Sequence, residues 1–124
     1  MIIVRKAKDI KKEEVGTGAG IERQILIGPS DGARNFILRC FTIGPGGSMP
    51  LHTNSVEHGQ YVLSGRARVV IGGEDFMVEE GDVVFIPGGV EHSYETLGEE
   101  PFVFLCVVPA DADRITILDS SSET

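Results

Sequence analysis

The sequence predicts an all-β protein, a β-sandwich or barrel with little or no helix. Three observations lead to this prediction. The apolar runs are short and rich in β-branched and aromatic residues, they are separated by many of the 16 glycines and 6 prolines, and no stretch keeps a 3.6-residue hydrophobic period. Short strands at regular spacing with turn residues between them are typical of sandwiches and barrels.

The expected strands follow one another between clusters of turn residues. In chain order they cover residues 23–28, 35–43, 59–65, 66–71, 74–80, 82–87, 92–97 and 101–109. The glycine- and proline-rich segments 28–32 and 44–47 are expected to be turns. Gly65 marks a tight bend, and Gly72 with Gly73 predicts a two-residue hairpin turn.

The length and strand pattern predict a single domain over residues 1–124. Residues 1–20 are expected to form an N-terminal strand and a polar, glycine-rich surface loop, the loop over 11–20, and residues 21–109 the barrel. Residues 110–124 should form a C-terminal turn and tail, in which 110–114 carry the one helix-like signal, a single turn.

Composition and charge exclude several classes of partner. The net charge of −8 argues against nucleic acid, since phosphate binding needs a basic face. No apolar run approaches the roughly 20 residues of a membrane span, and the first residues lack the pattern of a signal peptide. The expectation is a cytoplasmic protein that binds neither nucleic acid nor membrane. Cys40 and Cys106 lie inside apolar runs and are expected to be small buried hydrophobes rather than a disulfide.

The three histidines lie beside turn-rich segments at strand ends. The stretch HTNSVEH, residues 52–58, holds two of them, and His92 follows a Pro-Gly-Gly turn. In a barrel, strand ends far apart in sequence can surround one cavity. Strand alternation would place His58 and Gln60 on the inner face and turn Glu57 away. Three imidazoles at a barrel mouth can form a metal site with open positions; the alternative is that they are merely polar residues at strand ends.

Two segments resemble the paired motifs of the cupin superfamily, and their spacing agrees throughout. The first reads Gly46, five residues, His52-Thr53-Asn54, three residues, His58, six residues and Gly65; the second reads Gly81, five residues, Pro87-x-Gly89, two residues, His92 and then Thr96. The resemblance implies a small single-domain cupin of the cupin 2 conserved barrel type. It also implies the fold of that family, a double-stranded β-helix or jelly-roll barrel.

The chain departs from the family pattern at two positions. Asn54 stands where the family usually has histidine, and His58 stands where it usually has glutamate. The chain is therefore similar to the tetra-histidine cupins, with one histidine replaced. The resemblance implies one divalent transition metal ion (Fe, Mn, Zn, Ni, Co or Cu) held by His52, His58 and His92. Asn54 would be either an added oxygen ligand or a turn residue.

The resemblance also implies a homodimer, in which an N-terminal strand is often added to the partner's sheet. Residues 5–9 and 23–28 are the candidates for that strand. Strand alternation nominates further residues for the cavity wall, although two strands are apolar on both faces. In 35–43 either the Arg39 or the Cys40 face could look inward, and in 101–109 the Cys106 face is favoured. The candidates are Arg39, Phe41, Met49, Gln60, Tyr94, Phe104, Cys106 and Val108.

The expected function is metal-dependent chemistry on a small organic molecule. The apolar cavity candidates favour an Fe- or Mn-dependent oxidoreductase of the dioxygenase type. One alternative is a metal-dependent isomerase, lyase or hydrolase, for which Tyr94 and Arg39 are the available polar groups. The other is a non-catalytic module that binds a metal or small ligand. The sequence alone assigns no catalytic residue.

Overall fold

The computed structural model describes residues 1–111 and 115–118, which form ten β-strands and two short 3₁₀ turns. The elements are η1 Ala7–Asp9, β1 Glu13–Glu14, β2 Ala19–Ile27, η2 Pro29–Asp31, β3 Phe36–Asn54, β4 His58–Ser64, β5 Arg66–Ile71, β6 Glu74–Glu79, β7 Val83–Ile86, β8 His92–Leu97, β9 Phe102–Pro109 and β10 Ile115–Ile117. The prediction of an all-β protein with little helix is confirmed. None of the described residues belongs to a helix long and apolar enough to cross a membrane.

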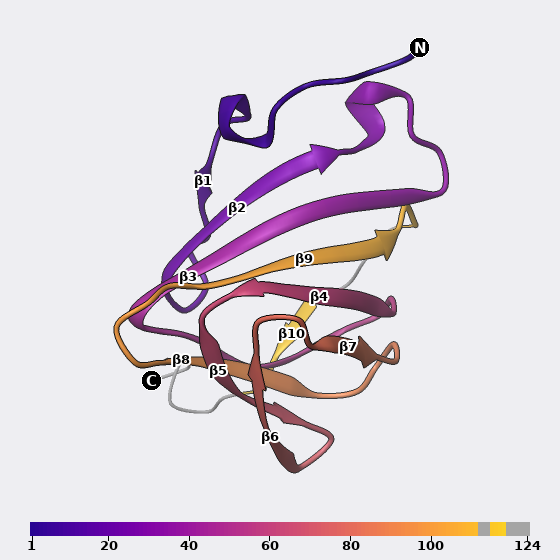
Figure 1. Cartoon of the computed structure of the whole chain (residues 1–124). Coiled ribbons are helices and arrows are strands. Elements are labelled where there is room, and N and C mark those ends of the chain that lie inside the picture. Colours follow the sequence, from indigo (N-terminus) through magenta and orange to yellow (C-terminus); the bar gives the residue numbers. More distant parts are fainter. Residues whose placement is uncertain (112–114, 119–124) are drawn as a thin grey trace.

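The strands form one curled antiparallel sheet. Its main path runs β6-β5-β8-β3-β9-β4-β7, with β2 and β10 also paired to β3 (Figure 1). The first half of β3 pairs with β2 and β9, and its second half pairs with β8 and β10. Because β3 belongs to both halves of the sheet, the inner faces of the two halves enclose one core.

The path of β3 differs from the sequence prediction. Residues 44–47 were expected to end the strand at a turn, yet the strand continues through them to Asn54. Gly46 has a φ of 75°, and a Cβ on Gly47 would lie 2.7 Å from the carbonyl oxygen of Ala19. The glycines therefore allow the strand to bend where the backbone of Ala19 approaches it closely. Within sheets, glycine serves such bends and close approaches as well as turns.

The two ends of the chain also differ from the prediction. No strand forms before residue 13, and residues 7–9 of the expected N-terminal strand form the turn η1. The loop expected over 11–20 contains the two-residue strand β1 and the start of β2. Strand β10 was not expected; residues 110 and 111 are a bend, and the rest of the predicted helical turn lies outside the described residues.

The core is built from the inward residues of β3, β4, β5, β8 and β9. Phe104 is at its centre, with ring centroids 5.4 Å from Phe41, 5.3 Å from Tyr94 and 5.2 Å from Phe102. Cys40 and Cys106 are both buried and form no disulfide, as predicted. Gly72 and Gly73 have φ values of 58° and 84°, which confirms the predicted hairpin turn.

Candidate metal centre and cavity

A cavity of about 90 Å³ opens into one end of the barrel beside the aromatic core. This volume is roughly that of three water molecules in the liquid. The cavity therefore accepts only a small ligand or part of a larger one. The described residues that line it are Val15, Thr17, Arg23, Arg39, Phe41, Met49, His52, Asn54, His58, Gln60, His92, Tyr94, Phe104, Cys106, Ile115 and Ile117.

The fold brings all three histidines to this cavity. His52 lies near the end of β3 and His92 begins β8, and the two are directly paired in the sheet register. Their ring centroids are 4.2 Å apart, and the centroid of His58, which begins β4, lies 5.8 Å from that of His92. All three side chains are buried.

The backbone orients two of the three imidazoles. Nδ1 of His52 donates to the carbonyl oxygen of Pro50 at 2.8 Å, and Nδ1 of His92 donates to that of Val90 at 2.9 Å. Since a carbonyl can only accept, Nδ1 carries a proton, and in the neutral ring Nε2 is then the nitrogen available to a metal. An orienting hydrogen bond of this kind is usual for metal-binding histidines.

The donor chemistry therefore suits a divalent transition metal. Within residues 1–111 and 115–118, however, no group of three His, Cys, Asp or Glu side chains is arranged so that it could hold a metal ion as it stands. The three rings converge, but their donor atoms do not yet form a coordination shell. Metal binding at His52, His58 and His92 stays a prediction.

Asn54 and Gln60 supply amide groups to the same cavity. Both are buried, whereas Glu57 is exposed and does not line the cavity. Gln60 Nε2 donates to the hydroxyl oxygen of Tyr94 at 2.6 Å. Burial raises the pKa of Tyr94 well above its ordinary value, against a smaller lowering by the Gln60 hydrogen bond. Tyr94 is therefore a neutral phenol that can donate a hydrogen bond into the cavity.

Arg39 resolves one of the alternatives that the sequence left open. It lines the cavity with Phe41, so this face of β3 looks inward and the Cys40 face looks outward. Arg39 Nη2 donates to Cys106 Sγ at 3.4 Å, and its guanidinium carbon lies 5.0 Å from the ring centroid of Phe41. Its Nε is buried with no hydrogen-bond partner among the described residues.

Cys106 is where the polar side chains of the cavity meet. Its Sγ lies 3.4 Å from His58 Nδ1 and 3.9 Å from Gln60 Nε2, besides the contact with Arg39. The inward direction of the Cys106 face of β9 agrees with the sequence prediction. Val108 on the same face is buried in the core, but it is not among the described residues that line the cavity.

Sequence reasoning missed five of the lining residues, namely Val15, Thr17, Arg23, Ile115 and Ile117. Arg23 was detectable in principle, because it lies two positions after the buried Ile21 on the same strand face. Arg23 and Arg39 bring two cations to the cavity, and none of the described lining residues is Asp or Glu. Arg23 also forms an ion pair with Glu13 outside the lining, with Nη2 4.0 Å from Oε1. The cavity is cationic although the chain carries a net charge of −8.

Comparisons with known proteins agree with this geometry. Residues 39–108, more than half of the chain, match the family model described as a cupin domain. The chain belongs to the cupin family. The resemblance to a small cupin and the jelly-roll barrel that it implied are thereby confirmed.

Individual cupins that the chain resembles differ in their named activities. The polyketide cyclase RemF from Streptomyces resistomycificus matches with a TM-score of 0.89 and 31% identity, over 95% of this chain and 86% of that one. The 1-methylthio-D-xylulose 5-phosphate methylsulfurylase of Rhodospirillum rubrum is 33% identical over 104 residues, 84% of this chain and 65% of that protein. The oxalate decarboxylase OxdC of Bacillus subtilis is 36% identical over 76 residues, 56% of this chain and 20% of that protein. The chain thus spans less than two thirds of these two curated relatives.

Proposed function

We propose that this cupin is a metal-dependent enzyme for a small, anionic carbonyl compound, with one divalent transition metal held by His52, His58 and His92. The observation that carries the proposal is the composition of the cavity. Three histidines and two arginines line it, and no acidic side chain is present among its described lining residues. A cationic cavity of this kind favours a carboxylate, an enolate or a phosphate.

The side chains of the cavity have separate roles in this proposal. When bound, the metal would act as a Lewis acid that polarises a carbonyl oxygen, and cupins generally bind a metal. Arg39, whose Nε has no described partner, would bind the anionic group of the substrate. Tyr94, positioned by Gln60, would donate a hydrogen bond to an oxygen on which negative charge develops. Phe41 and Phe104 exclude water and strengthen these interactions.

The names of the relatives support this substrate class. They mention a polyketide, a sugar phosphate and oxalate. Each of these compounds carries several oxygens and either carbonyl groups or an anionic group. The proposal accordingly favours enolisation, cyclisation or elimination chemistry over oxidation.

A second candidate is the dioxygenase that the sequence favoured. Phe41, Met49 and Phe104 form an apolar wall beside the histidines, which suits oxygen chemistry on an organic ligand. The two candidates differ in one measurable quantity, the consumption of oxygen.

The metal site can be tested without knowledge of the substrate. Protein purified without a tag and without added metal should contain about one equivalent of a transition metal. His52→Ala and His58→Ala should lose it, and Glu57→Gln, which alters an exposed side chain, should keep it. Elemental analysis by mass spectrometry gives the content. A wild-type protein that contains no metal and cannot be loaded with any would contradict the metal site.

Pyruvate is a suitable probe of the activity, because it is small, anionic and enolisable. In oxygen-free D2O the metal-loaded protein should exchange the methyl protons of pyruvate faster than the same concentration of metal alone, as measured by NMR. Arg39→Met and Tyr94→Phe should slow the exchange by about 10²-fold, and Glu57→Gln should not. Oxygen uptake in a parallel air-saturated sample, without proton exchange in the oxygen-free sample, would favour the dioxygenase. Binding of pyruvate with neither reaction would leave a ligand-binding module.

A further inference from the structure

Cys106 contacts both a proposed metal ligand and the arginine proposed to bind the substrate. Its Sγ lies 3.4 Å from Nδ1 of His58 and 3.4 Å from Nη2 of Arg39. The side chain is 1% exposed and lines the cavity. The chain also contains a comparison for it, because Cys40 is buried as well but lies on the strand face that looks away from the cavity. A difference between the two cysteines therefore reports what the contacts of Cys106 do.

The sheet register fixes these contacts. Arg39 on β3 and Gln60 on β4 are the direct partners of Cys106 on the two sides of β9. His58 lies two residues before Gln60 on the same face of β4, and it is the diagonal neighbour of Cys106. Direct and diagonal neighbours on one face of a sheet are within reach of each other. The backbone of three strands thus holds the sulfur beside both His58 and Arg39.

The contact with His58 has a counterpart at each of the other two histidines. Nδ1 of His52 and Nδ1 of His92 each donate to a carbonyl oxygen two residues earlier in the chain. At His58 the sulfur of Cys106 lies beside Nδ1. When Nε2 of a neutral imidazole binds a metal, Nδ1 carries the proton, and a thiol sulfur accepts hydrogen bonds, although weakly. The sulfur can therefore orient His58 as the carbonyl oxygens orient the other two rings.

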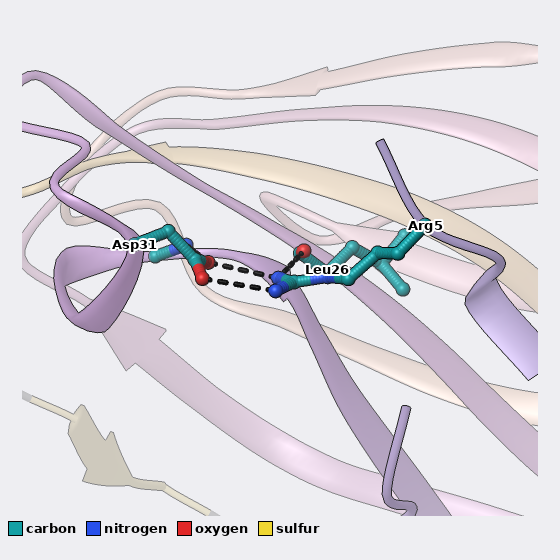
Figure 2. Close-up of polar contacts among 4 residues, drawn as sticks. Arg5, Leu26 and Asp31 are labelled. Atoms are coloured by element: carbon teal, nitrogen blue, oxygen red, sulfur yellow. Dashed lines mark hydrogen bonds and ion pairs between the residues drawn. The ribbon is translucent and has the colours of Figure 1, made fainter. Parts of the chain in front are cut away.

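Arg39 uses the same sulfur in place of a carboxylate. Arg5 shows the more usual arrangement of an arginine: its guanidinium donates to both carboxylate oxygens of Asp31, at 3.0 and 2.9 Å, and to the carbonyl oxygen of Leu26 (Figure 2). In the part of the chain that the structure describes, no Asp or Glu forms an ion pair with Arg39. Its Nη2 donates to Cys106 instead, so its positive charge is directed at the sulfur.

A metal at His58 would place a second positive charge near this arginine. Like charges a few ångströms apart repel more strongly in a protein interior than in water, because the dielectric constant is lower there. A polarisable sulfur that accepts a hydrogen bond from both groups reduces this repulsion. An apolar side chain at position 106 would neither accept the hydrogen bonds nor reduce the repulsion.

We propose that Cys106 is a positioning residue of the metal site. Its sulfur accepts a hydrogen bond from Nδ1 of His58, so that Nε2 is presented to the metal, and it shields that imidazole from the charge of Arg39. This role rests on the metal site proposed above. Cys106 touches neither the metal nor the substrate in it, and acts through His58.

The affinity of the full chain for Co²⁺, measured by isothermal titration calorimetry after removal of bound metal, tests this role. Cys106→Val keeps the core filled but has no acceptor, and it should bind Co²⁺ about 10–100-fold more weakly than the wild type. Cys106→Ser keeps an acceptor at the same position and should recover most of the affinity. Cys40→Val is the matched control and should bind as the wild type does, since Cys40 faces away from the cavity. Circular dichroism of each variant reports whether it is folded.

The visible absorption spectrum of bound Co²⁺ separates positioning from a general loosening of the core. At saturating Co²⁺ the spectrum reports the geometry of the ligands. It should change in Cys106→Val, where His58 loses its orienting partner, and should resemble that of the wild type in Cys106→Ser and Cys40→Val. A loosened core would weaken binding and leave the spectrum of the bound ion unchanged, which would overturn the positioning role.

The remaining outcomes distinguish this role from the metal site itself. A wild type that binds no Co²⁺ would remove the proposed metal site and the role of Cys106 with it. A wild type that binds Co²⁺, together with an unchanged affinity in Cys106→Val, would overturn the role of Cys106 alone. Equal losses in the valine and serine variants would overturn it too, because serine keeps the acceptor. So would an intense near-ultraviolet band in the wild type, since direct bonding of a thiolate to cobalt gives such a band and would make the sulfur itself a ligand.

Discussion

At the scale of a single residue, Cys40 links the pH to the stability of the barrel. Burial raises the pKa of its thiol above the ordinary value of 9.0, and nearby Lys12 lowers it by a smaller amount. The unfolded chain therefore releases the thiol proton at a lower pH than the folded protein does. The stability that this difference contributes is complete below pH 9 and is lost as the pH rises through the raised pKa.

Cys40→Ser removes this titration and changes the volume of the side chain little. Between pH 8 and 10 the free energy of unfolding of the variant should fall less steeply than that of the wild type, by at most about 1.4 kcal/mol per pH unit for one proton. Urea unfolding at fixed protein concentration gives both curves. Parallel curves would contradict the raised pKa.

Residue positions were predictable from the sequence where one strand face was clearly polar or apolar. Alternation placed Gln60 beside His58 and turned Glu57 outward, and the structure agrees. Alternation could not decide between Arg39 and Cys40, because both faces of that strand are apolar. The structure explains why: the inner face packs on the aromatic core, and on the outer face Cys40 lies beside Leu105, which lies beside Tyr61, in a row without charged residues.

At the scale of an element, Gly65 determines how β4 turns into β5. Its φ of 80° is in the left-handed region, and a Cβ would fall on the carbonyl oxygen of Pro101 and 2.9 Å from Cα of Phe102. Gly65→Ala should therefore destabilise the protein by about 3–5 kcal/mol.

Gly73→Ala is the control: its φ is 84°, but nothing lies within 4 Å of the added Cβ. It should cost only about 1–2 kcal/mol for the backbone conformation. Urea unfolding measures both, and equal losses would show that the steric contact at Gly65 is relieved.

The elements that could be predicted were those bounded by turn residues at both ends. Strands β4 to β9 fall within one or two residues of the expected ranges. Two elements depend on contacts that no local pattern contains. The bend within β3 needs Ala19 to approach Gly47, and β10, with three residues, exists because Ile117 pairs with His52 and Ile115 with Asn54. The sequence signal of a three-residue strand is too short to recognise.

At the scale of the whole molecule, the charge of the surface opposes the charge of the cavity. The net charge of −8 repels an anion that approaches from solution, whereas Arg23 and Arg39 attract it once it is inside. These two effects differ in range. Surface charges act over the Debye length, which is about 30 Å at 0.01 M salt and about 10 Å at 0.1 M. The arginines act over a few ångströms in a space that salt screens much less.

Ionic strength should therefore separate the two effects. For an anionic probe such as oxalate, binding should become tighter or stay constant as the ionic strength rises from 0.01 to 0.1 M, because salt removes the repulsion and leaves the attraction. A bulky salt anion such as a morpholine sulfonate avoids competition for the small cavity. The chain has two tyrosines and no tryptophan, so tyrosine fluorescence can follow binding next to Tyr94.

The neutral diamide of oxalate is the matched control, since it has a similar shape without the charge. Its affinity should not respond to salt, and Arg39→Met should weaken the binding of oxalate by about tenfold or more while it changes that of the diamide little. If oxalate instead binds more weakly as salt is added, the field of the arginines extends beyond the cavity. The acidic surface would then be too distant from the barrel mouth to matter, and the approach of substrate would be steered by the site itself.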